Sequence, residues 1–375
     1  MKMDTQLKSD KRKIKNTLGM FDQAKGVVML FVMLAHTYGL YDYANAHAAE
    51  FGRFTAIALR FLMVFGEALM PVFFIINGYG YRKTTLKKCV KKQGELLLFP
   101  YFVTSVVTLI IYGTSNFLET GYVKASIIVT LRRMIGFLFG YSIDKRIFGY
   151  TYLWCGPIWF LLAAFVGNVI FNELLNKFSG WKLLMASFLA ACIGWGLSFI
   201  YLMPWCISQG FVASLYICMG YLAKKEKIFT ERISGGFKTI AIILLITIIA
   251  LNIRGFGGGN MADGVYALGP VTIASGGLFG MVVIYIFLRM NRFNGRISAY
   301  IRTIGRYSLY VLCIHNIEFM TFGGRIQMAF VNSYKGNSVF VRSLIIFAIR
   351  TVIVTTAVLM YVWAKNKCMS RNQKV

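Results

Sequence analysis

Apolar runs of membrane-spanning length recur along this 375-residue chain and constrain its fold more than any other feature. An α-helix needs about 20 mostly apolar residues to cross a bilayer. Charged residues make up 15% of the chain, against about 25% in soluble domains. The sequence therefore predicts an all-α, polytopic integral membrane protein with about ten transmembrane helices. The expected spans are 20–40, 60–80, 95–113, 154–174, 182–201, 207–223, 237–253, 267–289, 301–322 and 341–364.

The distribution of positive charge predicts the orientation of these spans. With both termini in the cytoplasm, most of the 41 lysine and arginine residues fall in inner segments, as the positive-inside rule requires. Lys25 and Arg350 lie within spans. The net charge of +27 is then explained by topology and attraction to anionic lipid, so we expect no nucleic-acid partner.

Three units follow along the chain. We expect a basic cytoplasmic segment at 1–19, a ten-helix membrane domain at 20–364 and a basic cytoplasmic tail at 365–375, with no soluble domain at either end. The seven cysteines are scattered and form no CxxC pair, so no metal site is predicted.

Three ionisable residues interrupt the first apolar run: Asp22, Lys25 and His36. Such groups cost roughly 2.5–3.5 kcal/mol at membrane depth, so their default interpretation is functional. Eleven helical steps return to within about 20° of the same face, which puts Lys25 and His36 on one stripe. A neutral imidazole is a common general base, although an imidazole that only packs against a neighbouring helix is the alternative.

Other polar residues are expected at a similar depth in the outer half of the membrane. His315 lies in the ninth span and Glu67 in the second, so either can orient His36. Asn77 lies further along the second span, after Pro71, which frees a backbone carbonyl. For His315 the alternative is a histidine at the membrane interface. For Glu67 it is a carboxylate that only compensates for packing.

A cationic inner loop follows the second span and contains Arg82, Lys83, Lys87 and Lys88. Clustered lysine and arginine side chains bind phosphate groups, so the loop can hold an anionic cytoplasmic cosubstrate. The same charges also satisfy the positive-inside rule, and both interpretations are compatible.

Six motifs in order resemble acyltransferase family 3, most closely its stand-alone fucose 4-O-acetylase-like branch. The motifs lie at 22–36, 70–83, 96–101, 158–165, 219–225 and 304–315. The resemblance covers nearly the whole chain. A basic residue, ten further residues and a histidine, here Lys25 to His36, are moderately specific alone, whereas all six motifs in order are strongly specific.

The resemblance implies O-acetylation of a cell-envelope or extracellular polysaccharide sugar in the bacterial cytoplasmic membrane. Acetyl-CoA would be the cosubstrate, with no permanently bound cofactor, and a carbohydrate or lipid-linked glycan the acceptor. His36 matches the catalytic histidine, Lys25 its basic partner and Asp22 the preceding acid. The basic loop matches an arginine-rich motif but here is mostly lysine, and Asn77 replaces a common serine.

Two mechanisms and two other functions remain open from the sequence. His36 is expected to deprotonate the acceptor hydroxyl, with Asn77, Tyr310 or water donating to the developing oxyanion. An acetyl-imidazole intermediate on His36 is the second mechanism. A proton-coupled transporter that uses intramembrane His, Glu and Lys is the alternative function, and a sensing or scaffolding role is the other.

Overall fold

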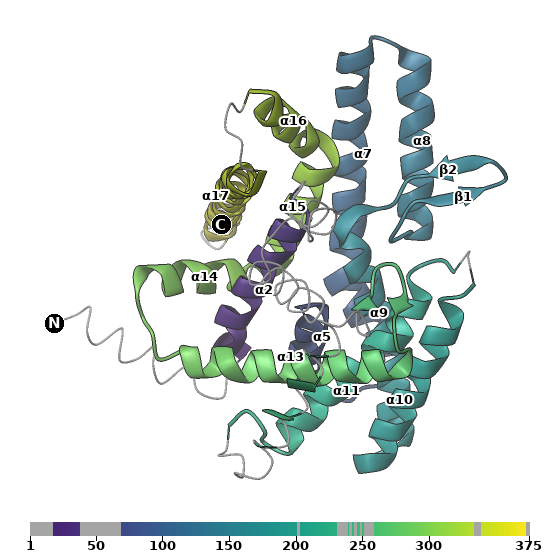
Figure 1. Cartoon of the computed structure of the whole chain (residues 1–375), viewed down its shortest axis with the longest axis vertical. Coiled ribbons are helices and arrows are strands. Elements are labelled where there is room, and N and C mark those ends of the chain that lie inside the picture. Colours follow the sequence, from purple (N-terminus) through teal and green to yellow (C-terminus); the bar gives the residue numbers. More distant parts are fainter. Residues whose placement is uncertain are drawn as a thin grey trace.

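The computed structural model is almost entirely helical (Figure 1). It describes residues 18–37, 69–200, 203–230, 259–333 and 339–372, and single positions between 239 and 250. Its α-helices are α2 (Asp22–Ala35), α5 (Leu69–Tyr79), α6 (Leu86–Gln93), α7 (Phe99–Thr120), α8 (Val123–Phe139), α9 (Trp159–Lys177), α10 (Gly180–Leu197), α11 (Ile207–Lys225), α13 (Pro270–Met290), α14 (Arg296–Arg306), α15 (Ser308–Glu318), α16 (Gly324–Ser333) and α17 (Val339–Asn372). The shorter elements are η1 (Leu18–Phe21), η2 (Gly94–Leu98), η3 (Gly156–Ile158) and η4 (Phe319–Gly323).

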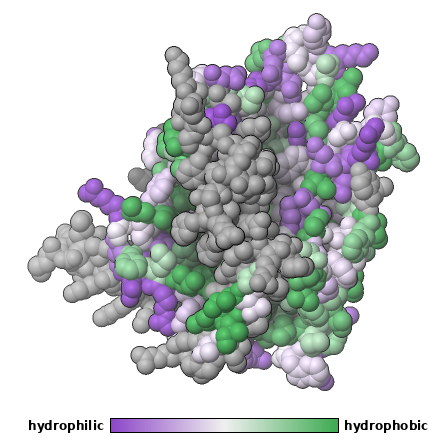
Figure 2. Space-filling model, in the orientation of Figure 1, coloured by the Kyte–Doolittle hydropathy of each residue, from purple (hydrophilic) through white to green (hydrophobic). Residues whose placement is uncertain are grey.

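Within the described ranges, five helical stretches are long and apolar enough to cross a membrane: 86–120, 156–177, 180–197, 270–290 and 341–367. Hydrophobic side chains also gather on the visible surface (Figure 2). Along α7, for example, Phe99, Phe102 and Leu118 are largely exposed, as expected of a lipid-facing helix. The all-α membrane fold is confirmed, whereas the number of spans and the side of the termini stay predictions. The seventh predicted span, 237–253, lies almost wholly outside the described residues.

Helix α11 forms the centre of one half of the molecule. It packs against α5, α9 and α10, and most of its residues are buried. Helix α13 lies across α5 and α2 (Figure 1). This packing fixes α5 against α9, which positions one wall of the cavities described below.

Helix α14 packs closely along α2. Gly26 of α2 permits this approach, because a Cβ atom there would lie 2.0 Å from the carbonyl oxygen of Ile301. Polar contacts join the same two helices: Arg306 Nε lies 3.4 Å from Asp22 Oδ2, and Ser298 Oγ donates to Gln23 Oε1 at 3.3 Å. The N-terminal half of α2 is therefore held by α14 through both close packing and charge.

Two predicted span boundaries are wrong. The ninth range, 301–322, is not one helix, because α14 ends at Arg306 and α15 begins at Ser308. Three arginines between 296 and 306 make α14 amphipathic, which suits an interfacial helix better than a spanning one. The third range, 95–113, is part of a continuous rod from Leu86 to Thr120, in which the π-helical turn η2 joins the cationic α6 to the apolar α7.

The first helix is also shorter than the predicted span 20–40, because α2 ends at Ala35. Side chains take the carbonyl groups of its last turn. His36 Nδ1 lies 2.7 Å from Val32 O, and the Thr37 hydroxyl donates to Met33 O at 3.0 Å. The backbone N–H of His36 still donates to Val32 O, whereas that of Thr37 donates to Leu34 O three residues earlier, so the α-helical pattern ends at His36.

The long loops contain two short hairpins. Strands β1 (Lys145–Ile147) and β2 (Tyr150–Tyr152) pair antiparallel, as do β3 (Gly259–Asn260) and β4 (Val265–Tyr266). The segment before β1 forms α8, which packs along α7 (Figure 1). The Ser142 hydroxyl donates to Ala262 O at 2.6 Å, which ties the two loops together.

Candidate active site

A cavity of about 580 Å³ lies beside the N-terminal half of α2 and the start of α6. Its lining includes five cationic side chains and no carboxylate. These cations are Lys25, Arg82, Lys83, Lys88 and Lys92. Lys25 Nζ lies 2.8 Å from Asp22 Oδ1, and its side chain keeps 19% of its surface exposed. A cavity of this charge suits an anionic ligand, and phosphate oxygens above all. We call it the basic cavity.

The loop that carries two of these cations is tied to α9. Asn172, fully buried on α9, holds both backbone groups of Thr84: its Nδ2 donates to Thr84 O at 3.0 Å, and its Oδ1 lies 3.4 Å from Thr84 N. The Tyr81 hydroxyl lies 3.3 Å from the same Oδ1. Arg82 and Lys83 thus extend from a loop whose backbone is fixed on either side of them.

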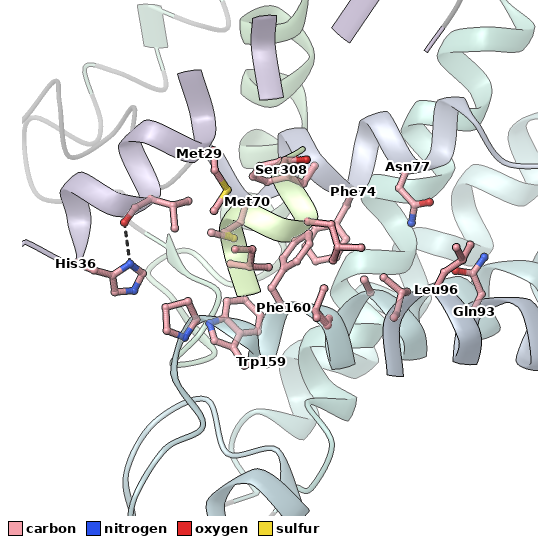
Figure 3. A pocket seen from close by; sticks show the side chains of 18 residues that line it. Met29, His36, Met70, Phe74, Asn77, Gln93, Leu96, Trp159, Phe160 and Ser308 are labelled. Atoms are coloured by element: carbon pink, nitrogen blue, oxygen red, sulfur yellow. Dashed lines mark hydrogen bonds between the residues drawn. The ribbon is translucent and has the colours of Figure 1, made fainter. Parts of the chain in front are cut away.

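A second cavity, of about 290 Å³, is mostly apolar and is lined by His36. Its walls come from α2, α5, α9 and α15, through side chains such as Met29, Phe74, Phe160 and Leu312. In Figure 3, His36 lies at one end of this cavity, and Asn77, Gln93 and Leu96 lie at the other. We call it the apolar cavity.

The two cavities adjoin. Asn77, Gln93 and Leu96 line both of them. A flexible chain that enters from the basic cavity can therefore pass these three side chains and extend along the apolar cavity to His36. The amide of Asn77 is itself held by α9, since its Nδ2 donates to Asn168 Oδ1 at 3.0 Å.

The hydrogen bond of His36 selects one tautomer of its neutral ring. Val32 O can only accept, so Nδ1 carries the proton that joins them at 2.7 Å. The neutral imidazole then has its lone pair on Nε2. A histidine in this form is able to remove a proton from a hydroxyl group placed at Nε2.

Aromatic rings surround the His36 imidazole. Ring centroids of Phe319, His315 and Trp154 lie 5.1, 5.4 and 6.4 Å from that of His36. Trp154 is fixed through its backbone, because its N–H donates to Asp144 Oδ1 at 2.7 Å and its carbonyl accepts from Arg133 Nη1 at 2.8 Å.

A buried ion pair lies next to this cluster. Arg350 on α17 binds Glu318 at the end of α15, with Nε and Nη2 at 2.9–3.2 Å from the two carboxylate oxygens. The third nitrogen, Nη1, donates to the backbone carbonyl of His36 at 2.6 Å. Both charged side chains are only 1% exposed.

His315 completes the group. Its side chain is 0% exposed, and its Nδ1 lies 3.4 Å from Glu318 Oε2. Neither ring nitrogen makes a hydrogen bond within the described residues. The predicted proximity of His315 to His36 is confirmed, and the interfacial alternative for His315 does not fit a ring without exposed surface.

The structure does not bring all the predicted residues together. The Tyr310 hydroxyl accepts from Lys365 Nζ at 2.8 Å, so Tyr310 faces α17 and does not line the apolar cavity. Asn77 lies at the opposite end of the apolar cavity from His36 (Figure 3), so the structure does not bring these two side chains together. Lys87 is exposed and does not line the basic cavity. Glu67 lies outside the described residues.

Several residues of the site were not predicted, among them Glu318, Gln93 and Leu96. Arg350 had a signal in the sequence, since an arginine inside an apolar span is costly without a partner. Lys92 belongs to the predicted cationic loop but was not selected from it. Trp154 and Phe319 carry no signal, because aromatic residues are common throughout such a chain, at 16% of all residues here.

A family model described as an acyltransferase domain, that of acyltransferase family 3, matches residues 19–363. The chain belongs to acyltransferase family 3.

Membership in acyltransferase family 3 makes this chain a multi-pass membrane acyltransferase, which requires an acyl donor and an acceptor. It favours the enzyme over the proton-coupled transporter. A search of curated proteins and of solved structures gives no significant match. The match extends across α2, the basic cavity, the apolar cavity and most of α17.

Proposed function

We propose that this acyltransferase transfers an acetyl group from acetyl-CoA to a hydroxyl group of a cell-envelope or extracellular polysaccharide sugar. His36 acts as the general base. The enzyme works in the bacterial cytoplasmic membrane with both termini in the cytoplasm. The sugar acceptor rests on the resemblance to the fucose 4-O-acetylase-like branch.

One observation carries this proposal: the basic cavity and the apolar cavity share Asn77, Gln93 and Leu96. Acetyl-CoA has a phosphate-rich nucleotide at one end and a thioester at the end of a long flexible arm. The nucleotide binds among the cations beside Lys25 and Arg82, and the arm passes the three shared residues. The thioester then reaches His36, the polar group at the far end of the apolar cavity.

The transfer uses the free nitrogen of His36. Nε2 accepts the proton of the acceptor hydroxyl as its oxygen attacks the thioester carbonyl carbon. The carbon–sulfur bond breaks, the acetyl group stays on the oxygen, and the departing thiolate takes the proton back from Nε2. The atoms balance without an oxidant, a reductant or a metal ion. General-base catalysis of this kind contributes about 10²–10⁴-fold.

Asp22 and Lys25 act at the donor end of the enzyme. Asp22 lies between Lys25 and Arg306, at 2.8 and 3.4 Å, and orients the ammonium group of Lys25 at the edge of the basic cavity. His315 acts as an orienting residue beside the base, since its ring lies 5.4 Å from that of His36 and its Nδ1 lies 3.4 Å from Glu318 Oε2.

The test is acetyl transfer by the purified protein in lipid nanodiscs. Acetyl-CoA and an envelope glycan are supplied, and the product is measured by mass spectrometry and by release of free CoA. We expect one acetyl group on the glycan for each CoA released, and a rate lowered by about 10²–10⁴-fold with His36→Ala. Labelled glycan that crosses the membrane without gaining an acetyl group, at normal protein levels, would refute the proposal.

A further inference from the structure

We propose that Arg350 is the positioning residue that fixes His36 for transfer. This inference rests on the proposed function, because it assumes that His36 is the base. Arg350 lies on α17, far from His36 in the sequence, and it lines neither the basic nor the apolar cavity. It acts on the reaction through the backbone of His36.

The hydrogen bonds of Arg350 divide between two partners. Nε and Nη2 bind the carboxylate of Glu318, whereas Nη1 donates to His36 O at 2.6 Å. The carboxylate fixes the plane of the guanidinium group, and the fixed plane directs Nη1 at the carbonyl. An ion pair needed only for stability would not require the third contact.

The bond to His36 O lies where α2 ends. The His36 carbonyl follows the last helical residue, Ala35, so the helix itself offers it no partner. The imidazole depends on the same turn, because its Nδ1–H donates to Val32 O four residues earlier. A turn that loosens loses this bond, and with it the tautomer that leaves Nε2 free.

Through Phe319, the guanidinium group of Arg350 adds a second restraint on His36. The guanidinium carbon of Arg350 lies 5.3 Å from the centre of the Phe319 ring, and that ring lies 5.1 Å from the His36 ring. Arg350 therefore holds the backbone of His36 directly and supports the ring that contacts its imidazole. Transfer is sensitive to displacements of this size, since about 1 Å of misplacement can cost 100-fold in rate.

The test separates positioning from stability with paired variants. Arg350→Met leaves Glu318 buried and without its cation, so we expect it to lower both kcat and Tm. Arg350→Met combined with Glu318→Leu removes both charges, and we expect Tm and protein level to recover. The kcat should stay at least about tenfold below wild type, because the bond to His36 O is still missing. Recovery of kcat together with Tm would overturn the proposal.

Two further variants serve as controls. Arg325 resembles Arg350 in its contacts, since it binds a carboxylate, Glu119, and a backbone carbonyl, that of Ser115, but both charged side chains are exposed. Arg325→Met should leave kcat unchanged. Glu318→Gln keeps Arg350 on the His36 carbonyl and should cost less kcat than the double variant. An equal loss in Glu318→Gln would assign the effect to the contact between Glu318 and His315 and overturn the role of Arg350.

A measurement that does not depend on catalysis separates the role of Arg350 from the proposed acetyl transfer. Amide hydrogen exchange over residues 28–37 should be faster in the double variant than in wild type or Arg325→Met, because the last turn of α2 has lost its tie to α17. Unchanged exchange would overturn the positioning role. Absence of acetyl transfer by the wild type would instead refute the proposed function, while the exchange data still decide whether Arg350 holds His36. The donor KM should not move in any variant, since Arg350 does not line the cavities.

Discussion

Lys25 and His36 lie on one helix but line two different cavities. Lys25 belongs to the cationic cavity and His36 to the apolar one, and the cavities adjoin at Asn77, Gln93 and Leu96. Under the proposed function, α2 carries the base at one end and a cation of the donor site near the other, and its length sets the separation between the two ends of the donor.

Replacing His36 tests the chemistry directly. His36→Ala and His36→Gln should lower the rate of acetyl transfer by about 10²–10⁴-fold, because both remove the lone pair that accepts the hydroxyl proton. Transfer is followed by release of CoA from the purified protein. The amount of protein in the membrane should equal that of wild type. Full activity in either variant would exclude His36 as the base.

Two neighbouring lysines separate a specific contact with the donor from a general effect of positive charge on donor binding. Lys88 lines the basic cavity, whereas Lys87 does not. Lys88→Gln should raise the KM for acetyl-CoA about tenfold, which corresponds to about 1.4 kcal/mol of lost binding. The donor KM of the wild type should also rise with salt, since partly exposed charges are screened. Lys87→Gln is the matched control, and an equal effect from both lysines would contradict a specific cavity.

A bulky side chain at Leu96 tests the passage between the two cavities. Leu96 lines both, so Leu96→Trp adds bulk at the point where the donor arm must pass. We expect kcat/KM for acetyl-CoA to fall by about tenfold or more, or about 1.4 kcal/mol. Leu118→Trp makes the same change at a largely exposed position on the same rod and should have no effect. Steady-state kinetics with varied acetyl-CoA measure both.

Close packing of α2 on α14 predicts a stability effect. Gly26→Ala introduces a methyl group 2.0 Å from Ile301 O, so the helices must move apart. Overpacking of this kind costs about 1–3 kcal/mol, seen as a lower Tm in detergent. A Cβ atom at Gly94, in the π-helical turn, meets nothing within 4 Å, so Gly94→Ala should be neutral or stabilising. A Tm for Gly26→Ala equal to that of wild type would show that the two helices are free to separate.

Hydrophobic periodicity and charge predicted the membrane fold, the cationic loop and the pairing of His36 with His315. Each of these follows from residues close in sequence or from the depth at which a polar group falls in a span. The ion pair of Glu318 with Arg350 does not, because nothing in the pattern of either helix says which helix it faces. The oxyanion role predicted for Tyr310 was wrong for the same reason. The sequence gives the position of Tyr310 on its helix but does not indicate its partner, Lys365 on α17.

The predicted helix boundaries were wrong where a helix ends within an apolar stretch of the sequence. An apolar window continues beyond Ala35, yet α2 ends there, since the Thr37 N–H donates to Leu34 O three residues earlier and does not continue the α-helical pattern. The window 301–322 looks continuous, yet the arginines of α14 separate it from α15 at Tyr307. Residues 38–68, which include Glu67, lie outside the described residues.

The short length of α2 bears on how much water reaches the His36 imidazole. Its 14 residues rise about 21 Å, less than the roughly 30 Å of a bilayer's hydrocarbon layer. The His36 imidazole at the end of this helix lies among the rings of Phe319, His315 and Trp154, which limit the access of water to it. Under the proposed function, hydrolysis of the thioester is the wasteful side reaction, and these apolar surroundings discourage it by limiting the water near His36.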